Sequence, residues 1–260
     1  MKKLIYFNLG NNVELIELAK LCIISLENQK YDGDFLFITN YKQEILKKIK
    51  CNNKVVFLEL NENDLNPAFF RFKIYEFEKI YDYDRILYCD TDILFFTNPD
   101  KIFDLLNSDH IFVSNDTYVK NITCLMTTKI ESLPFWGENL LSNDEKLFIE
   151  NNKVLAINAG IFAFNKNMIS NFAKIDNFIK ENKNLILDLT LDQPFFNVFL
   201  FREKNYKNVL NDLVSHNGLD VLKNQNEEFE RKEIIHFAGE IGVATNKILA
   251  MEKVLKLTSN

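Results

Sequence analysis

Residues 83–96 carry the sequence Tyr-Asp-Arg-Ile-Leu-Tyr-Cys-Asp-Thr-Asp-Ile-Leu-Phe-Phe. The apolar run Ile86–Tyr88 predicts a buried strand, and two carboxylates one residue apart, Asp90 and Asp92, follow it. Two acids so close together lose hydration and repel one another, so a compensating partner is expected. A divalent cation such as Mg²⁺, Ca²⁺ or Mn²⁺ suits these oxygen ligands. Taken alone, the pattern also fits a surface turn with two hydrated acids.

The N-terminal part of the chain alternates between apolar runs and amphipathic segments. Strands are expected at 4–9, 35–39, 55–60 and 86–88, and helices at 13–28, 43–50 and 66–81. This order predicts an α/β fold whose central sheet is mainly parallel, with helices on both faces. In such sheets ligands bind beyond the carboxyl ends of the strands, where Asp90 and Asp92 would lie.

The second half of the sequence is less regular. Strands are expected at 110–114, 155–164 and 233–237, helices at 168–182, 192–202 and 248–257, and a polar loop at 210–230. A long insertion at about 116–154 is typical of a lid or binding loop. It contains Trp136, which could form a platform for a carbohydrate acceptor or pack the insertion onto the core. We expect a single domain over 1–260, with a nucleotide-binding half at 1–105 and an acceptor-side half at 106–260.

Composition excludes several classes of protein. The net charge is −6, so no overall positive field attracts nucleic acid or an anionic membrane. The chain has 7 glycines, and neither a dinucleotide fingerprint nor a phosphate-binding loop occurs. Its 4 cysteines are scattered, which favours reduced thiols in the cytoplasm over a disulfide framework or a zinc site. No window is long and apolar enough for a membrane span, and the N-terminus is expected to be a core strand rather than a signal peptide.

The pair Asp90-Thr91-Asp92 resembles the DxD motif of GT-A fold glycosyltransferases, and four companion segments follow the same order as in that class. They are Arg71-Phe72-Lys73, Asn158-Ala159-Gly160, Asp192-Gln193 and His236-Phe237-Ala238-Gly239. On these motifs the chain is identified as a member of glycosyltransferase family eight, which contains glycogenin and the bacterial lipooligosaccharide galactosyltransferases. The resemblance covers nearly the whole chain.

The resemblance implies a role for each matching residue. Manganese, with magnesium as an alternative, would be held by Asp90, Asp92 and His236. The catalytic residues would be Asp192, which accepts hydrogen bonds from sugar hydroxyls, and Gln193, which lies beneath the reacting anomeric carbon. The donor would be bound by the following residues: Asn8, Asn11, Arg71, Lys73, Asp90, Thr91, Asn158, Ala159, Gly160 and Gly239.

The implied activity is retaining transfer of a hexose from a UDP-sugar to a glycan or glycolipid, such as a bacterial surface polysaccharide or lipooligosaccharide. The protein would be cytoplasmic, with at most a peripheral contact at the inner face of the membrane, and would not bind nucleic acid. No oligomeric state is implied. Because Arg71 and Lys73 are two residues apart, they would point to different sides of a regular helix.

One departure from the family pattern leaves alternatives open. Close relatives carry a diphosphate-binding lysine where this chain has Gly242, so Lys247 or the pair Arg71 and Lys73 would have to supply the charge. A protein that binds the donor without transferring it is therefore one alternative. A haloacid-dehalogenase-like phosphatase is another, although Leu94 stands where that class has threonine. A nucleotidyltransferase would need a glycine-rich basic loop after the first strand, which is absent here.

Overall fold

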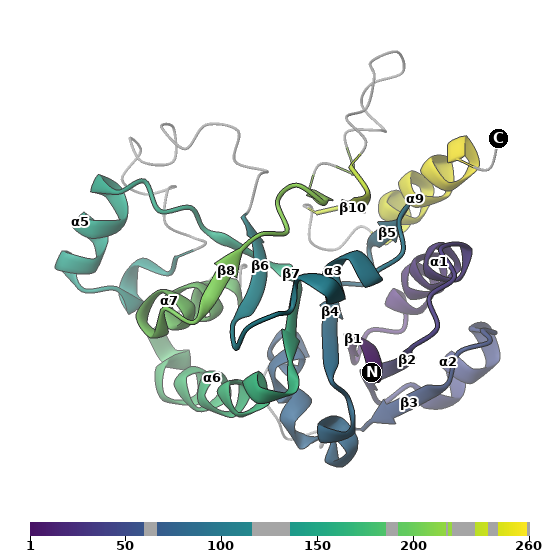
Figure 1. Cartoon of the computed structure of the whole chain (residues 1–260), viewed down its shortest axis with the longest axis horizontal. Coiled ribbons are helices and arrows are strands. Elements are labelled where there is room, and N and C mark those ends of the chain that lie inside the picture. The colour runs from purple at the N-terminus through teal and green to yellow at the C-terminus, as the bar shows by residue number, and fades with distance from the viewer. Residues whose placement is uncertain are drawn as a thin grey trace.

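The structure is a computed structural model that describes residues 1–59, 67–115, 136–185, 192–216, 218–219, 232–238 and 244–258. At its centre lies a sheet of seven strands in the order β3-β2-β1-β4-β7-β6-β8 (Figure 1). The strands are β1 (Lys3–Gly10), β2 (Asp34–Thr39), β3 (Val55–Leu58), β4 (Arg85–Cys89), β6 (Ile111–Asn115), β7 (Ile157–Asn165) and β8 (Tyr206–Asn208). Only β7 runs antiparallel to its neighbours, so the expected mainly parallel sheet is confirmed.

Helices cover both faces of this sheet, as the sequence predicted. One face packs against α6 (Ile169–Asn182), α7 (Gln193–Glu203) and the 3₁₀ helix η1 (Pro67–Glu76). The other face packs against α1 (Leu15–Asn28), α2 (Lys42–Lys48) and α3 (Asp100–Leu105). Alternate residues of β1 supply the two cores, because successive side chains of a strand point to opposite faces. None of the helices in the described ranges is long and apolar enough to cross a membrane.

A second, smaller sheet stands at the carboxyl end of β4. It joins β5 (Ile93–Phe95), β10 (Ile234–His236) and β9 (Val214–Ser215) in the order β5-β10-β9. The antiparallel pairing of β10 with β5 sets His236 opposite Ile93. The amide of Phe237 also donates to the carbonyl oxygen of Asp92 at 2.9 Å. This small sheet therefore brings the C-terminal histidine beside the two aspartates, and α9 (Ala244–Thr258) packs against it.

Some expected elements differ in the structure. The regular helix predicted at 66–81 is wound as two 3₁₀ helices, η1 and η2 (Glu78–Asp82), whose three-residue turns bury Phe69 with Phe72 and Phe70 with Lys73. The short strands β5, β8 and β9 were not predicted, since runs of two or three residues carry too little pattern. Helix α5 (Asn143–Asn151) was also not predicted; a capping box between Ser142 and Glu145 begins it.

Part of the predicted insertion, residues 116–135, lies outside the described residues. Trp136 is only 4% exposed, and its ring meets that of Phe201 edge-on at 5.8 Å. Of the two interpretations of Trp136, the structure therefore supports packing onto the core. The remaining 3₁₀ turns of the described chain are η3 (Glu138–Leu140), η4 (Lys166–Met168) and η5 (Lys183–Leu185).

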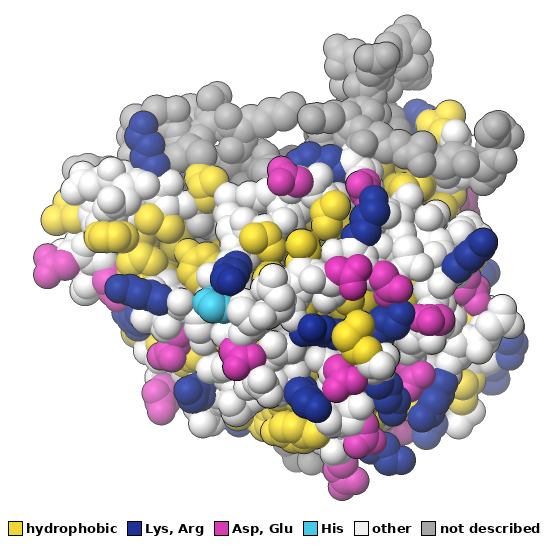
Figure 2. Space-filling view, viewed as in Figure 1, with side chains coloured by type: hydrophobic (Ala, Val, Ile, Leu, Met, Phe, Trp, Pro, Cys, Tyr) yellow, Lys and Arg dark blue, Asp and Glu magenta, His cyan; other side chains and the backbone are white. Residues whose placement is uncertain are grey.

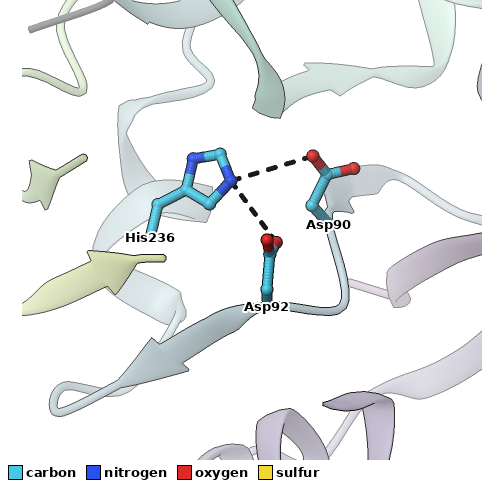
Figure 3. A group of neighbouring side chains, drawn as sticks. All are labelled: Asp90, Asp92 and His236. Atoms are coloured by element: carbon cyan, nitrogen blue, oxygen red, sulfur yellow. Dashed lines mark ion pairs between the residues drawn. The ribbon is translucent and has the colours of Figure 1, made fainter. Parts of the chain in front are cut away.

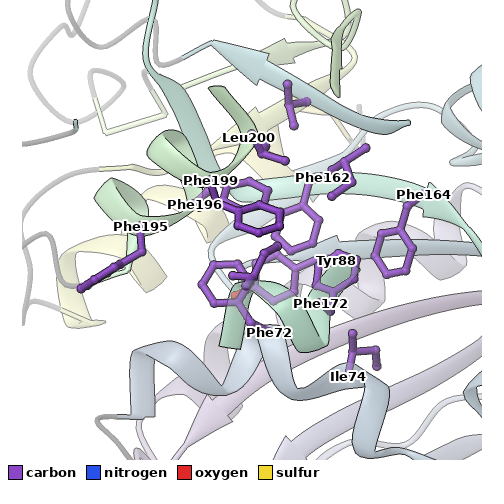
Figure 4. Packing of buried hydrophobic residues seen from close by; sticks show 14 of the residues in the cluster. Phe72, Ile74, Tyr88, Phe162, Phe164, Phe172, Phe195, Phe196, Phe199 and Leu200 are labelled. Atoms are coloured by element: carbon purple, nitrogen blue, oxygen red, sulfur yellow. The ribbon is translucent and has the colours of Figure 1, made fainter. Parts of the chain in front are cut away.

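A cluster of stacked aromatic rings fills the core beneath β4 and β7 (Figure 4). Phe162 lies at its centre, with its ring centroid 4.8 Å from that of Tyr88 and 4.9 Å from that of Phe196. The ring centroids of Phe164 and Phe172 lie 4.3 Å apart, and the two rings are tilted by 37°. Truncating a buried phenylalanine of this kind to alanine typically costs about 3–5 kcal/mol of stability. The cluster fixes the ring of Tyr88, whose hydroxyl points out of the core toward Asp90.

The face seen in Figure 2 carries Lys and Arg side chains interspersed with Asp and Glu. Neither sign of charge gathers into a single patch on this face, in keeping with the modest net charge of −6.

Candidate metal centre and adjoining pocket

Asp90, Asp92 and His236 converge at the carboxyl end of β4 (Figure 3). One ligand atom from each lies within 4.8 Å of the others. His236 Nε2 faces both carboxylates, at 3.4 Å from Asp92 Oδ1 and 3.8 Å from Asp90 Oδ2. The cluster joins the end of the large sheet to the end of the small one, and the amide of Asp90 is fixed by the carbonyl oxygen of Gly160 at 2.7 Å.

Each carboxylate turns its second oxygen toward a partner within the protein. Asp90 Oδ1 accepts a short hydrogen bond from the Tyr88 hydroxyl and lies 3.2 Å from Arg71 Nη1. Asp92 Oδ2 lies 2.5 Å from Lys247 Nζ, on helix α9. Burial alone would raise the pKa of Asp92, but the Lys247 ammonium and the His236 ring outweigh burial and hold that pKa below its usual value. One oxygen of each acid thus remains directed at His236.

The second nitrogen of His236 is also engaged. His236 Nδ1 lies 3.0 Å from His216 Nδ1, and His216 Nε2 lies 2.9 Å from the hydroxyl oxygen of Ser114. Burial lowers the pKa of His216 well below its usual value, and the neighbouring His236 and Lys232 lower it further. The sequence alone did not point to Ser114 or His216, although the chain has only 3 histidines.

Gly160 lies against two side chains of this cluster, His236 and Asp90. A Cβ at this position would stand 2.4 Å from His236 Cε1 and 2.8 Å from Asp90 Oδ2. Real side chains do not approach this closely, so only glycine fits. Its neighbours serve the same corner: Asn158 Oδ1 accepts from the amide of Gly160 at 2.8 Å, and the carbonyl oxygen of Ala159 accepts from Arg71 Nη1 at 2.8 Å.

A pocket of about 280 Å³ opens beside the cluster. The carboxyl end of β1 contributes Asn8 and Gly10 to its wall. Asn8 is held by its own bonds, since its Nδ2 donates to the carbonyl oxygen of Pro67 at 2.9 Å and its Oδ1 accepts from the amide of Gly10 at 3.1 Å. The remaining polar lining includes Asn12, Arg71, Asp90, Thr91, Asp92 and Lys247. Glu14 also lines the pocket, so two cationic side chains stand there beside three carboxylates.

Asp192 and Gln193 lie where β7, η1 and α7 meet. Asp192 is 8% exposed and its Oδ2 lies 2.7 Å from Arg71 Nε. Burial raises the pKa of Asp192 to about 6; Arg71 opposes this rise and Asp90 adds to it. Gln193 begins α7 directly after Asp192 and is half-buried. Arg71 therefore connects the Asp90–Asp92–His236 cluster to Asp192, because it pairs with Asp90 as well.

Five described residues of the predicted donor site do not line the pocket. Asn158, Ala159 and Gly160 lie in the corner beside Asp90 and His236, and Lys73 and Asn11 lie elsewhere. Lys73 is 2% exposed and points into the protein, with Nζ 5.8 Å from the ring centroid of Phe70 and 3.9 Å from Glu76 Oε1. Asn11 is exposed and its Oδ1 accepts from Asn40 Nδ2, whereas Asn12 lines the pocket. Gly239, and Gly242 in the departure noted above, lie outside the described residues.

The donor set fits a hard divalent cation. Two carboxylate oxygens and one imidazole nitrogen are ligands that Mn²⁺ and Mg²⁺ accept, and soft thiolate ligands are absent from the described cluster. Asp92 and His236 are buried and Asp90 is partly buried, and the second polar atom of each side chain is held by a neighbour, as is typical of metal ligands in proteins.

Comparison with solved structures identifies the fold as that of the GT-A glycosyltransferases. A structure of an active-site mutant of LgtC matches with a TM-score of 0.63 and 13% identity over 96% of this chain and 95% of LgtC. The galactosyltransferase LgtC in complex with donor and acceptor sugar analogs matches equally well. GlyE of Streptococcus pneumoniae TIGR4 matches with a TM-score of 0.62 and 13% identity, over 99% of this chain and 64% of GlyE.

The bifunctional glycosyltransferase WbbM is similar with a TM-score of 0.56 and 14% identity, over 98% of this chain and 51% of WbbM. The sequence itself matches no known family profile, and no curated protein sequence matches it. The similarity of structures therefore confirms the fold expected from the motifs, although the sequence identity to these proteins is low.

Proposed function

We propose that the protein is a metal-dependent hexosyltransferase that moves a hexose from a UDP-sugar to a glycan or glycolipid acceptor with retention of configuration. The observation that carries the proposal is the convergence of Asp90, Asp92 and His236 beside a pocket at the carboxyl end of β4. The fold supports it, because the similar structures are glycosyltransferases and LgtC was solved with donor and acceptor sugar analogs.

The pocket offers the groups that a nucleotide diphosphate requires. A Mn²⁺ or Mg²⁺ ion held by Asp90, Asp92 and His236 would supply positive charge against the charge that develops on the leaving diphosphate. The Lys247 ammonium lines the same pocket and can contact a diphosphate oxygen, which would replace the charge missing at Gly242. Asn8, fixed in place at the end of β1, is proposed to contact the base.

The sugar is proposed to lie on the Asp192 side of Arg71. There Asp192 would accept hydrogen bonds from sugar hydroxyls, and Gln193 would stabilise positive charge at the anomeric carbon. A neutral amide is a weak nucleophile, so stabilisation is the role that we assign to Gln193. Arg71 already pairs with Asp90 and Asp192, and it is proposed to hold the two halves of the donor site in register.

The remaining assignments are part of the same proposal. We assign residues 1–105 to nucleotide binding and 106–260 to the acceptor, with a bacterial surface polysaccharide or lipooligosaccharide as the acceptor class. The proposed compartment is the cytoplasm. A phosphatase of the haloacid-dehalogenase type is disfavoured, because one oxygen of Asp90 is taken by Tyr88 and Arg71 and the similar folds are glycosyltransferases.

Release of UDP tests the proposal. Purified protein is incubated with a panel of UDP-sugars and Mn²⁺, and UDP release is followed with and without EDTA. We expect release with at least one donor, and loss of more than about a hundredfold in Asp92→Asn and His236→Ala. Asp104→Asn, an exposed acid of α3, is the matched control and keeps full activity.

Two outcomes separate the alternatives. If a UDP-sugar binds but no UDP is released, the result would support a donor-binding protein instead of an enzyme. Release that survives EDTA in both variants would refute the metal site.

A further inference from the structure

Three buried side chains, one of them His236 of the candidate metal centre, form a chain of hydrogen bonds. Ser114 Oγ lies 2.9 Å from His216 Nε2, and His216 Nδ1 lies 3.0 Å from His236 Nδ1. The exposed fractions are 0% for Ser114, 1% for His216 and 4% for His236. The far nitrogen of His236, Nε2, is the one that faces Asp90 and Asp92. The chain therefore ends at the nitrogen that would bind a cation.

Hydrogen-bond chemistry links the protonation of all three groups. A bond between two imidazole nitrogens needs a proton on one of them and a lone pair on the other. If His236 Nε2 gives its lone pair to a cation, the proton of that ring lies on Nδ1 and is donated to His216 Nδ1. His216 then carries its proton on Nε2 and donates it to the Ser114 hydroxyl oxygen. His236 can therefore bind a metal through Nε2 when the hydrogen bonds are donated from His236 to His216 and from His216 to Ser114.

Backbone contacts of the two sheets fix the positions of Ser114 and His216. Ser114 belongs to β6 of the large sheet, and His216 directly follows β9 of the small sheet. Strand β9 pairs with β10 at Ser215 and Ile235, and the amide of Gly218 donates to the carbonyl oxygen of His236 at 3.1 Å. His216 is consequently held from both sides, next to the residue that it contacts.

We propose that His216, backed by Ser114, is a positioning residue that fixes the metal-binding tautomer and the ring orientation of His236. This inference rests on the metal site in the proposed function. Partners of this kind, which hold the second nitrogen of a ligating histidine, typically change metal affinity by about 10- to 100-fold when they are removed. A purely structural buried pair would affect stability and leave metal affinity unchanged.

The first test uses the unaltered protein. Long-range ¹H–¹⁵N NMR spectra report which ring nitrogen of each histidine is protonated, and the chain has only 3 histidines to assign. With saturating Mg²⁺ we expect the proton of His236 on Nδ1 and that of His216 on Nε2. A proton on Nε2 of His236 in the Mg²⁺-saturated protein would overturn the proposal.

The second test measures Mn²⁺ affinity from the electron paramagnetic resonance signal of free Mn²⁺. His216→Phe removes the acceptor and keeps a ring of similar size, so we expect a Kd for Mn²⁺ raised about tenfold or more. His216→Asn restores an acceptor near the position of Nδ1 and should recover affinity to within about threefold. His110→Phe, which alters a partly exposed histidine beside Ser108, is the matched control.

The outcomes distinguish this inference from the proposed function. If the unaltered protein binds Mn²⁺ and His216→Phe binds it equally well, the positioning role is wrong and the metal site stands. If the unaltered protein binds no Mn²⁺, the metal site and the positioning role both fail. If His216→Phe does not fold, the NMR spectra and the His216→Asn affinity decide, and a tenfold loss in the asparagine variant would also count against the proposal.

Discussion

Lys247 is expected to oppose metal binding and to favour nucleotide binding, so one substitution should change the two affinities in opposite directions. Its Nζ lies 2.5 Å from Asp92 Oδ2, and the two side chains are 17% and 10% exposed. Burial alone would lower the pKa of Lys247, but the facing Asp92 carboxylate outweighs burial and holds the pKa above its usual value. Lys247→Met removes this charge and keeps a long, unbranched side chain.

The magnitude follows from Coulomb's law. A divalent cation on the other oxygen of Asp92 would lie about 5 Å from the ammonium, and even in the dielectric of water their repulsion is about 1.7 kcal/mol. Lys247→Met should therefore lower the Kd for Mn²⁺ alone by about tenfold. A charge-assisted contact to a diphosphate oxygen contributes about 1.5–3 kcal/mol. The Kd for UDP at saturating Mn²⁺ should accordingly rise by about ten- to a hundredfold.

Both affinities can be measured by isothermal titration calorimetry, with Mn²⁺ alone and then with UDP at saturating Mn²⁺. Lys256→Met, an exposed lysine on the same helix, is the control and should change neither affinity. Weaker binding of both ligands would refute the reasoning, because it would show that Lys247 supports Asp92 as a metal ligand. An unchanged affinity for UDP would show that the ammonium does not reach the diphosphate.

Two further predictions concern the same corner of the molecule. Gly160→Ala would place a methyl group 2.4 Å from His236 Cε1. We expect Mn²⁺ affinity, measured by titration, to fall at least tenfold, and the free energy of unfolding in urea to fall by about 1–3 kcal/mol. An unchanged Mn²⁺ affinity would contradict the packing argument. The second concerns Asp192, whose folded pKa of about 6 lies above its unfolded value, so the folded protein binds the extra proton and its stability falls as pH rises from about 4 to 6. Asp192→Asn should remove on the order of 3 kcal/mol of that fall in metal-free unfolding experiments, and identical slopes for both proteins would contradict the raised pKa.

The sequence was sufficient for the parts of the fold that have a strong local pattern. Apolar runs and helical spacing predicted β1, α1, β2 and β4 within a few residues of their bounds. The prediction of a regular α-helix at 66–81 was wrong. The apolar residues there repeat at three-residue spacing, which fits 3₁₀ turns as well as α turns. The antiparallel direction of β7 has no local signature, since it depends on how the chain returns to the sheet.

The candidate site divides in the same way. Asp90, Asp92 and His236 were predicted together as metal ligands, and the structure brings them together. The partners behind them could not be predicted, because Ser114 and His216 lie about a hundred residues apart and meet only through the tertiary fold. The two-residue spacing of Arg71 and Lys73 predicted that their side chains point in different directions. In the structure Arg71 reaches the pocket and Lys73 is buried elsewhere.

The small sheet has a consequence for the order in which the molecule assembles. Its pairing of β5 with β10 closes a loop of roughly 140 residues, and contacts of such high sequence separation form late because of the chain entropy that they cost. Asp90 and Asp92 leave a ribosome long before His236 does. During synthesis the two aspartates therefore emerge without the third side chain of their cluster, and the cluster is complete only when β10 joins β5.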